Sequence, residues 1–362
     1  MSDSATTAPP AARKPAIISP VVDTLCVGGL SIVAFLPVVL LGQKYFLLPD
    51  TFRAGHLASQ AIIATLINMP HFMASYSMVY HSKETMLKHK WAAIYVPIGL
   101  AAYGVFAVFM SDTTMVYVAV MQSISGIYLA WHYTGQAWGM MATYAFLEGA
   151  PFSERERLLV RSGLRILLAW HVTWFCQFGT NLPWIHQTLG AAYFYLSMLT
   201  WVAFVLGAVA FYLYWRRTGR MPAFKALVAW LAIFFWYGAM AVDLRAIFWV
   251  QIAHALQYLI FPFRVQMNRY ERAHPAQPRQ LRVHILGYAG MLLFAAYAAE
   301  HFLVEAGMIS AGVIFGAPAG DAAPIVMLAF LNIHHYFTDG CIWKISNPDV
   351  RRDLFAHVPK PA

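Results

Sequence analysis

Charged residues are scarce in this sequence. Only 11% of its 362 residues are Asp, Glu, Lys or Arg, while 60% are hydrophobic. A soluble globular protein carries about 25% charged residues, so this composition does not fit an ordinary soluble enzyme. The chain contains repeated apolar runs of about 20 residues, the length that a helix needs to cross about 30 Å of hydrocarbon. The composition therefore indicates a polytopic membrane protein.

Cysteine is also rare, and several functional motifs are missing. The three cysteines, Cys26, Cys176 and Cys341, lie far apart in apolar segments, and no CxxC or CxxCH motif occurs. This argues against a disulfide framework and against attached c-type haem. The sequence has no Gly-rich phosphate loop and no GxSxG motif. It also lacks the soluble basic domain that a nucleic-acid-binding protein would need.

The apolar runs predict an all-α fold, a bundle of ten transmembrane helices. Backbone polar groups must be satisfied inside lipid, so each span is a helix. We expect a disordered tail over 1–20, one transmembrane domain over 21–345 and a short tail over 346–362. The predicted spans are 21–41, 57–80, 91–110, 115–145, 158–178, 188–214, 223–241, 246–264, 284–304 and 323–345.

The distribution of basic residues predicts the topology. With loops numbered alternately from an inside N-terminus, 22 of the 25 Lys and Arg residues fall inside, and only Lys44, Arg53 and Arg245 fall outside. The positive-inside rule then places both termini in the cytoplasm and the protein in the cell membrane. The net charge of +9 follows from the same pattern. The small-residue segment 306–321 is expected to be an outside loop or a re-entrant piece.

Histidine is frequent for such an apolar chain, with 14 residues. Six of them lie within three residues of the centres of five predicted spans, which puts them within about 5 Å of one depth. A polar group in hydrocarbon is costly without a partner. A single histidine at this depth is more often a packing residue, but a shared site explains the whole set. The candidate metal ligands are His71, His132, His171, His254, His334 and His335.

Polar residues one helical turn from these histidines are expected to support them. Residues three or four apart share a helix face, and a metal-bound imidazole usually donates its other N–H to an oxygen acceptor. Asp339 suits this role for His335, or is itself a ligand. Adjacent histidines point about 100° apart, so we expect one of His334 and His335 to ligate and the other to hydrogen-bond. The supporting set is Asn68, Gln136, Gln251, Gln257 and Asp339.

Ten spans with histidines on several helices resemble the integral-membrane non-haem iron enzymes. The nearest types are the Brp/Blh-type carotene dioxygenases, whose histidines from separate helices hold iron, and the fatty-acid desaturase and hydroxylase superfamily. The sequence lacks the HxxxH and HxxHH boxes of the desaturases. The resemblance concerns architecture and implies no residue roles.

These observations favour a membrane metal-dependent oxidoreductase, an oxygenase with iron that acts on a lipid or isoprenoid from the bilayer, with or without a redox partner. Histidines with one carboxylate suit iron, copper or zinc rather than calcium or magnesium. Two alternatives stay open: a haem- or copper-binding electron-transfer protein, and a transporter of metal ions or protons. Aromatic residues beside the histidines, including Trp131 and Tyr258, line a substrate pocket or fill the core. The sequence does not indicate the oligomeric state.

Overall fold

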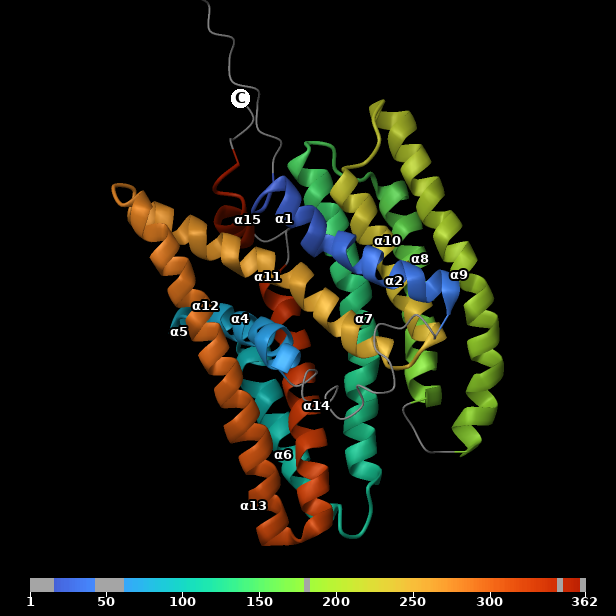
Figure 1. The fold of residues 1–362 in the computed structure, drawn as a ribbon, viewed down its shortest axis with the longest axis vertical. Helices are drawn as coiled ribbons and strands as arrows, with labels where there is room; N and C mark the ends of the chain where they lie inside the picture. Colours follow the sequence, from blue (N-terminus) through green and yellow to red (C-terminus); the bar gives the residue numbers. More distant parts are fainter. Residues whose placement is uncertain (1–15, 43–61, 179–182, 344–347, 359–362) are drawn as a thin grey trace, which may run out of the picture.

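The computed structural model describes residues 16–42, 62–178, 183–343 and 348–358. Within these ranges every regular element is a helix and no strand occurs, which confirms the all-α class (Figure 1). In chain order the elements are α1 (Pro20–Thr24), η1 (Leu25–Gly29), α2 (Leu30–Leu41), η4 (Ala64–Asn68), α4 (Met69–Val79), α5 (Lys83–Lys88), η5 (Trp91–Tyr95), α6 (Val96–Met110), α7 (Val116–Leu147), α8 (Glu154–Phe178), α9 (Pro183–Thr218), α10 (Phe224–Val242), α11 (Ala246–Ala273), η6 (Pro278–Gln280), α12 (Leu281–Ala298), η7 (Ala299–Glu305), α13 (Ala306–Phe315), α14 (Ala317–Ile342) and α15 (Pro348–Leu354).

Six helical segments of the described chain are long and apolar enough to cross a membrane. They are Pro20–Leu41, Trp91–Met110, Thr188–Thr218, Phe224–Val242, Ala246–Ala273 and Pro278–Phe315. The predicted spans 57–80, 115–145, 158–178 and 323–345 are not among them. These four regions carry five of the six selected histidines, and polar side chains lower the hydropathy of a segment. Four of the five helices that carry the selected histidines are therefore outside this set of six, and α11, which carries His254, is within it.

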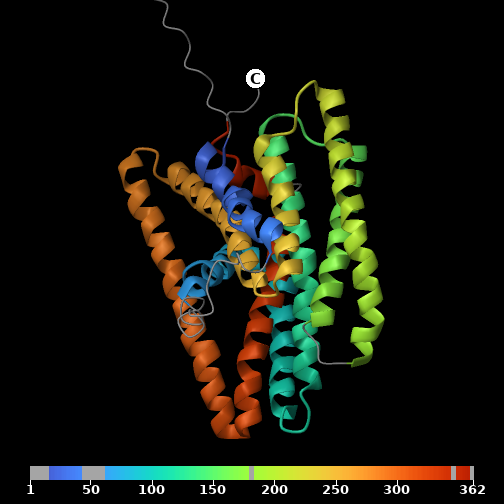
Figure 2. The same cartoon turned by 45° about the vertical axis from the view of Figure 1, so that its right-hand side comes forward.

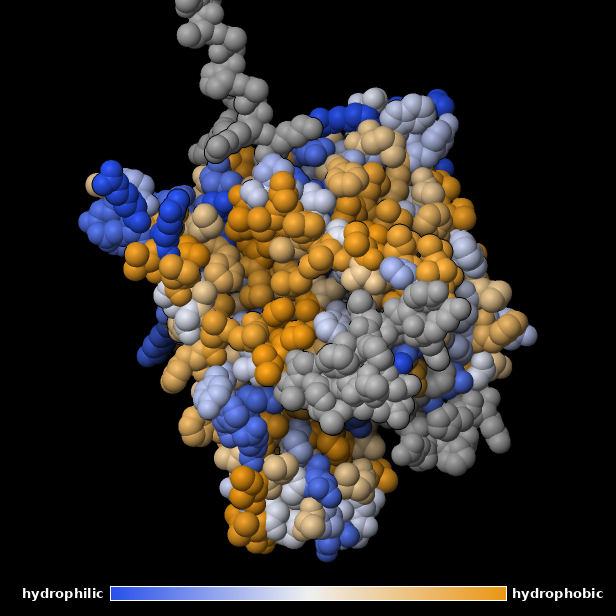
Figure 3. All heavy atoms as spheres, in the orientation of Figure 1, coloured by the Kyte–Doolittle hydropathy of each residue, from blue (hydrophilic) through white to orange (hydrophobic). Residues whose placement is uncertain are grey.

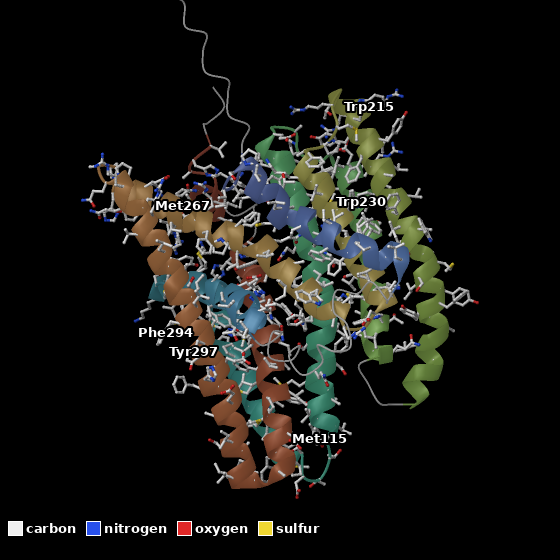
Figure 4. The ribbon with its side chains drawn as sticks, in the orientation of Figure 1. Met115, Trp215, Trp230, Met267, Phe294 and Tyr297 are labelled. Carbon is white, nitrogen blue, oxygen red and sulfur yellow. The ribbon has the colours of Figure 1, made fainter. Side chains whose placement is uncertain are left out.

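The outer surface carries large apolar side chains. On α12, Phe294 is 73% exposed and Tyr297 is 53% exposed, and both lie on the outer side of this helix (Figure 4). Figure 3 shows apolar residues across the middle of the molecule, with hydrophilic residues gathered over the α9–α10 and α11–α12 connections. An exposed apolar surface of this extent is unfavourable in water and suits contact with lipid tails.

The segment 306–321 consists of helix on both sides of Gly316 rather than of an irregular loop. α12, η7 and α13 continue one another, and the chain then reverses into α14 (Figure 2). The reversal occurs at Gly316, whose φ of +93° is in the left-handed region that favours glycine. A close approach follows, because Gly312 lies against Gly320: a Cβ added at Gly320 would be 3.2 Å from the Gly312 Cα.

The two ends of the described chain pack onto α11. The Ile17 and Ile18 N–H groups donate to the Asp23 carboxylate at 2.7 and 2.9 Å, and the Arg264 side chain donates to the Ile17 carbonyl. The predicted N-terminal tail, 1–20, lies mostly outside the described residues. The predicted C-terminal tail contains α15, which Asn268 fixes by donating to the carbonyl oxygens of residues 353 and 354 at 2.8 and 3.0 Å.

Candidate metal centre

Four buried histidines from four different helices meet at one point. α4 supplies His71, α7 supplies His132, α11 supplies His254 and α14 supplies His335, and each is at most 6% exposed. The His71 ring centroid lies 4.6 Å from that of His335 and 5.3 Å from that of His254. The His132 centroid lies 4.7 Å from that of His254 and 4.9 Å from that of His335. We call these four rings and Asp339 the histidine cluster.

The donor atoms of the histidine cluster are spaced as ligands of a metal ion are. Nε2 of His132 lies 3.0 Å from Nε2 of His254. Oδ2 of Asp339 lies 3.4 Å from Nε2 of His335 and 3.7 Å from Nε2 of His132. Bonds of about 2.1 Å at angles of 90° to 109° place neighbouring ligands roughly 3.0–3.4 Å apart. The cluster therefore needs only small adjustments to close around an ion.

The donor atoms form two sets of three that are close enough together to bind a metal ion, and both sets contain His335. One set is His71, His254 and His335, and the other is His132, His335 and Asp339. In each set the donor atoms all lie within 4.8 Å of one another. These groups could hold a metal ion. The second set consists of two imidazoles and one carboxylate.

Hydrogen bonds at Nδ1 leave Nε2 of two rings free for a ligand role. Nδ1 of His71 donates to the carbonyl oxygen of Asn68, one turn earlier. Nδ1 of His335 lies 2.9 Å from Oγ of Ser75. Nε2 of each ring is buried and has no hydrogen-bond partner among the described residues. An unpaired buried polar atom costs about 1–3 kcal/mol, and coordination to a metal would remove this cost at both positions.

Asp339 is held by a chain of donors that the sequence analysis only partly identified. Its Oδ1 accepts from Ser75 Oγ at 2.7 Å and from the Tyr258 hydroxyl at 3.0 Å. The Trp343 indole N–H donates to the Tyr258 hydroxyl at 2.8 Å. Because the Ser75 hydroxyl donates its hydrogen to Asp339, the lone pairs of Ser75 Oγ are available to accept the His335 Nδ1–H. The carboxylate thus orients His335 through Ser75, and its Oδ2 stays directed at the two Nε2 atoms.

The sequence analysis missed Ser75 and Trp343, although helical spacing marks both. Ser75 follows His71 by four residues on α4, and Trp343 follows Asp339 by four residues at the end of α14. Residues four apart lie on one face of a helix. The same rule that identified Asp339 beside His335 identifies these two residues when it is applied to hydroxyl and indole donors as well as to carboxylates and amides.

The backbone of the second predicted span is distorted beside His71. Residues 64–68 form η4, a π-helical turn, and Pro70 follows at the start of α4. Proline lacks the N–H that would continue the hydrogen-bond ladder, and π-helical turns inside α-helices are frequent at functional sites. A backbone distortion is therefore present in this span, and it lies shortly before His71, the residue that enters the cluster.

The predicted glutamines divide into two groups. Gln136 donates to the His254 carbonyl oxygen at 3.1 Å and to Oε1 of Gln257 at 3.0 Å. Gln257 in turn donates to the Val27 carbonyl oxygen. These bonds tie α7, α11 and η1 together behind His254. Gln251 is half-buried and does not belong to this network.

His334 points away from the cluster. Its ring stacks on Tyr76 with centroids 4.9 Å apart, and its Nε2 lies 3.1 Å from the Ala92 carbonyl oxygen and 3.2 Å from the Tyr80 hydroxyl. The hydrogen bond from His334 Nε2 to the Ala92 carbonyl oxygen joins α14 to η5. The structure therefore separates the adjacent pair into one ring inside the cluster and one outside it.

His171 lies next to the cluster without joining it. It is fully buried, and its Nδ1 lies 3.0 Å from the Tyr237 hydroxyl. The ring of Tyr133 stands between His171 and His254, with centroids 5.7 Å from the first and 4.6 Å from the second. His171 is thus a neighbour of the cluster on α8 rather than a member of the two donor sets.

A cavity of about 220 Å³ borders the cluster. His132 and Asp339 form part of its wall, so the cavity reaches the donor atoms directly. The other lining residues are Trp131, Gly135, Gln136, Gly139, Met140, Thr143, Tyr258, Phe261, Gly340, Trp343, Val350 and Leu354. A mostly apolar cavity with a few convergent polar groups is the usual form of a small-molecule site.

No family model, curated protein or solved structure matches the chain. The comparisons thus supply no fold family and no residue roles. The arguments about this site come from its geometry and chemistry.

Proposed function

We propose that this protein is an integral-membrane metal-dependent oxidoreductase, an oxygenase that acts on a lipid or isoprenoid. The observation that carries the proposal is the buried set of His132, His335 and Asp339. Two histidines and one carboxylate, arranged with open coordination positions, are typical of non-haem Fe(II) oxygenases. Iron held in this way supplies O2 activation. His71 and His254 lie close enough to add nitrogen ligands.

The residues of the chain fix the geometry and the charge of such a site. Ser75 holds the His335 ring through Nδ1, and Asn68 holds the His71 ring in the same manner. Asp339 is the one carboxyl group among the donors, and Ser75 and Tyr258 keep it in place. Outer hydrogen bonds of this type orient metal ligands and raise their basicity.

The apolar cavity beside the cluster supports a hydrocarbon substrate. Its lining includes two tryptophans, one phenylalanine and one methionine, and it borders His132 and Asp339. The exposed apolar residues on the outside of the molecule support a position of the cavity at the depth of lipid tails. A substrate dissolved in the bilayer can reach such a site without crossing water.

For the topology we propose ten spans in the cell membrane with both termini in the cytoplasm. The charge distribution supports it, with 22 of 25 basic residues on one side. The positions of α1 and α15 at the same end of the molecule also support it (Figure 1). The four proposed spans outside the six apolar segments carry every cluster residue except His254, together with Ser75 and His171, and these polar groups face neighbouring helices. Intramembrane polar groups with internal partners are tolerated in this way.

The geometry favours this proposal over haem. Two axial histidines need a flat slot between their nitrogens for the porphyrin, but Nε2 of His132 and Nε2 of His254 are only 3.0 Å apart. The adjacent His334 and His335 do not form a joint copper site either, because their rings diverge. Copper bound by the cluster itself, and a metal or proton transporter, remain the alternatives that experiment must separate.

One set of measurements on the purified protein separates the three functions. Elemental analysis should find iron, and the absorption spectrum should have no strong Soret band. Incubation with O2 and membrane lipids should yield an oxygenated product. A Soret band would replace the proposal by haem-based electron transfer, copper without iron would favour a copper protein, and metal or proton flux in liposomes without product would indicate a transporter.

A further inference from the structure

The cavity beside the cluster is bounded on its open side by glycines. Gly135 and Gly139 lie four residues apart on α7, and Gly340 directly follows Asp339 on α14. A Cβ added at Gly135 or Gly139 would meet nothing within 4 Å, and one at Gly340 would meet only the Trp131 ring at 3.9 Å. Gly135 and Gly139, about 6 Å apart along α7, therefore add no side chain to the cavity wall, whereas Gln136 and Met140 of the same helix do.

Residues of α7 and α14 line the cavity, and some of those on α7 are exposed at the surface of the molecule. Trp131 is 51% exposed and Gly135 is also exposed, so the lining reaches the outer surface of α7. At another part of the wall Val350 and Leu354 of α15 close the cavity. The exposed part of the lining, at Trp131 and Gly135, thus lies on the outer surface, which contacts lipid in the proposed function. The part of the lining at Val350 and Leu354 is closed by α15.

The chemistry of the lining selects hydrocarbon over a charged headgroup. None of the described lining residues is Lys or Arg, so these residues offer an anionic headgroup no counter-charge. The one acidic residue, Asp339, belongs to the cluster. The volume of about 220 Å³ is below the roughly 300–1,000 Å³ of pockets that enclose a whole small molecule. The cavity therefore accepts one segment of a longer molecule.

We infer that the gap between α7 and α14 at Gly135, Gly139 and Gly340 is a lateral portal that admits a single hydrocarbon chain of a bilayer molecule to the histidine cluster. The inference rests on the proposed function only for the reaction of the hydrocarbon chain at the cluster. The headgroup and the rest of the molecule stay in the membrane. The glycines set the width of the portal, so bulk at these positions excludes the chain without touching a donor atom.

Photo-crosslinking in proteoliposomes tests the portal independently of turnover. The probes are a long-chain fatty acid with a diazirine near its end and a polyisoprenoid alcohol with the same group. In the wild-type protein at least one probe should label α7 around 131–140 or α14 around 339–343. Labelling there should fall roughly tenfold or more in Gly135→Phe, the change that about 1.4 kcal/mol of lost binding free energy produces.

Gly99→Phe is the matched control. Gly99 is an exposed glycine on α6 with nothing within 4 Å of an added Cβ, so both variants change helix propensity alike. The control should label as the wild type does, and both variants should keep the wild-type metal content. Equal labelling of Gly135→Phe and Gly99→Phe in these segments would overturn the portal. Labelled segments in a wild-type protein without metal would instead support the portal and contradict the oxygenase.

Discussion

His334 and His335 are adjacent in the chain, yet their rings contact different parts of the molecule. Nδ1 of His335 lies 2.9 Å from Ser75 Oγ inside the cluster, whereas Nε2 of His334 lies 3.1 Å from the Ala92 carbonyl oxygen outside it. Both are buried on the same helix, at 0% and 5% exposure. The pair therefore provides a ligand variant and a control variant that differ by one position.

The first prediction uses this pair. His335→Ala should lose most of the bound transition metal, because both donor sets contain this residue and a lost ligand removes a metal bond directly. His334→Ala should keep the metal, because it removes contacts with Ala92, Tyr80 and Tyr76 that lie outside the cluster. Elemental analysis of the two purified variants at matched expression measures the difference. Equal metal content in both would leave histidine packing as the better account of the cluster.

The second prediction concerns the support of His335. Asp339→Asn and Ser75→Ala should each leave an inserted protein whose metal affinity or turnover is about 10–100-fold lower, the usual cost of losing an outer hydrogen bond to a ligand. Metal titration and product per mole of protein measure both effects. Asp112→Asn is the control, since Asp112 is exposed in the turn between α6 and α7. Wild-type behaviour of both cluster variants would remove Asp339 and Ser75 from the site.

The third prediction concerns Asp353, which is not a free tail residue. It pairs with Arg269 at 2.9 Å and with Arg272 at 2.8 Å and is 13% exposed. Asp353→Asn should therefore loosen α15, by about 0.2–1 kcal/mol for each pair. Limited proteolysis of the C-terminal segment should be faster in this variant than in Asp112→Asn. Identical rates would show that α15 is held by Asn268 and apolar contacts alone.

The same residue predicts a pH dependence. Burial raises the pKa of Asp353, but hydrogen bonds from Arg272 and Arg269 outweigh it and hold the pKa below its ordinary value. A depressed carboxylate pKa stabilises the docked state above the undocked pKa of about 3.9. That stability is lost as the pH falls through the lower docked pKa. Proteolysis of the C-terminal segment by an acid-active protease should accelerate below about pH 4 in the wild type and stay nearly flat in Asp353→Asn.

The fourth prediction tests the ten-span topology. Reporter fusions after Arg220 and after Arg282 should report the cytoplasm, and a fusion after residue 53 should report the outside. The basic residues at the α9–α10 and α11–α12 connections give the reason, since cytoplasmic loops are enriched in Lys and Arg. An outside signal at Arg282 would require a different number of spans and would move the cluster to another depth.

Composition and spacing were sufficient for the helical class and for the main members of the cluster. Equal depth on separate helices selected His71, His132, His254 and His335, because a shared site is the economical reason to bury several imidazoles. The same criterion also selected His171 and His334, since depth carries no information on rotation about the helix axis. Whether a ring faces the cluster or Tyr237 is set by helix packing.

Other features depend on contacts between distant segments. The sequence analysis assigned Asp353 to a tail because it follows the last apolar run, whereas α15 folds back onto Arg269 and Arg272, about 80 residues earlier. The segment 306–321 looked like a loop because glycine and alanine dominate it. Small residues instead allow α13 and α14 to approach closely, as helices do in membranes.

The position of His335 on α14 has a consequence for how the protein matures. His335 belongs to both donor sets, and α14 is the last long helix of the described chain. A ribosome delivers the N-terminal helices first, so His71, His132 and His254 wait in the bilayer as an incomplete cradle until α14 enters. The proposed metal site would then be complete only after α14 has entered the membrane, because a chain that stops before residue 335 lacks the histidine that both donor sets share.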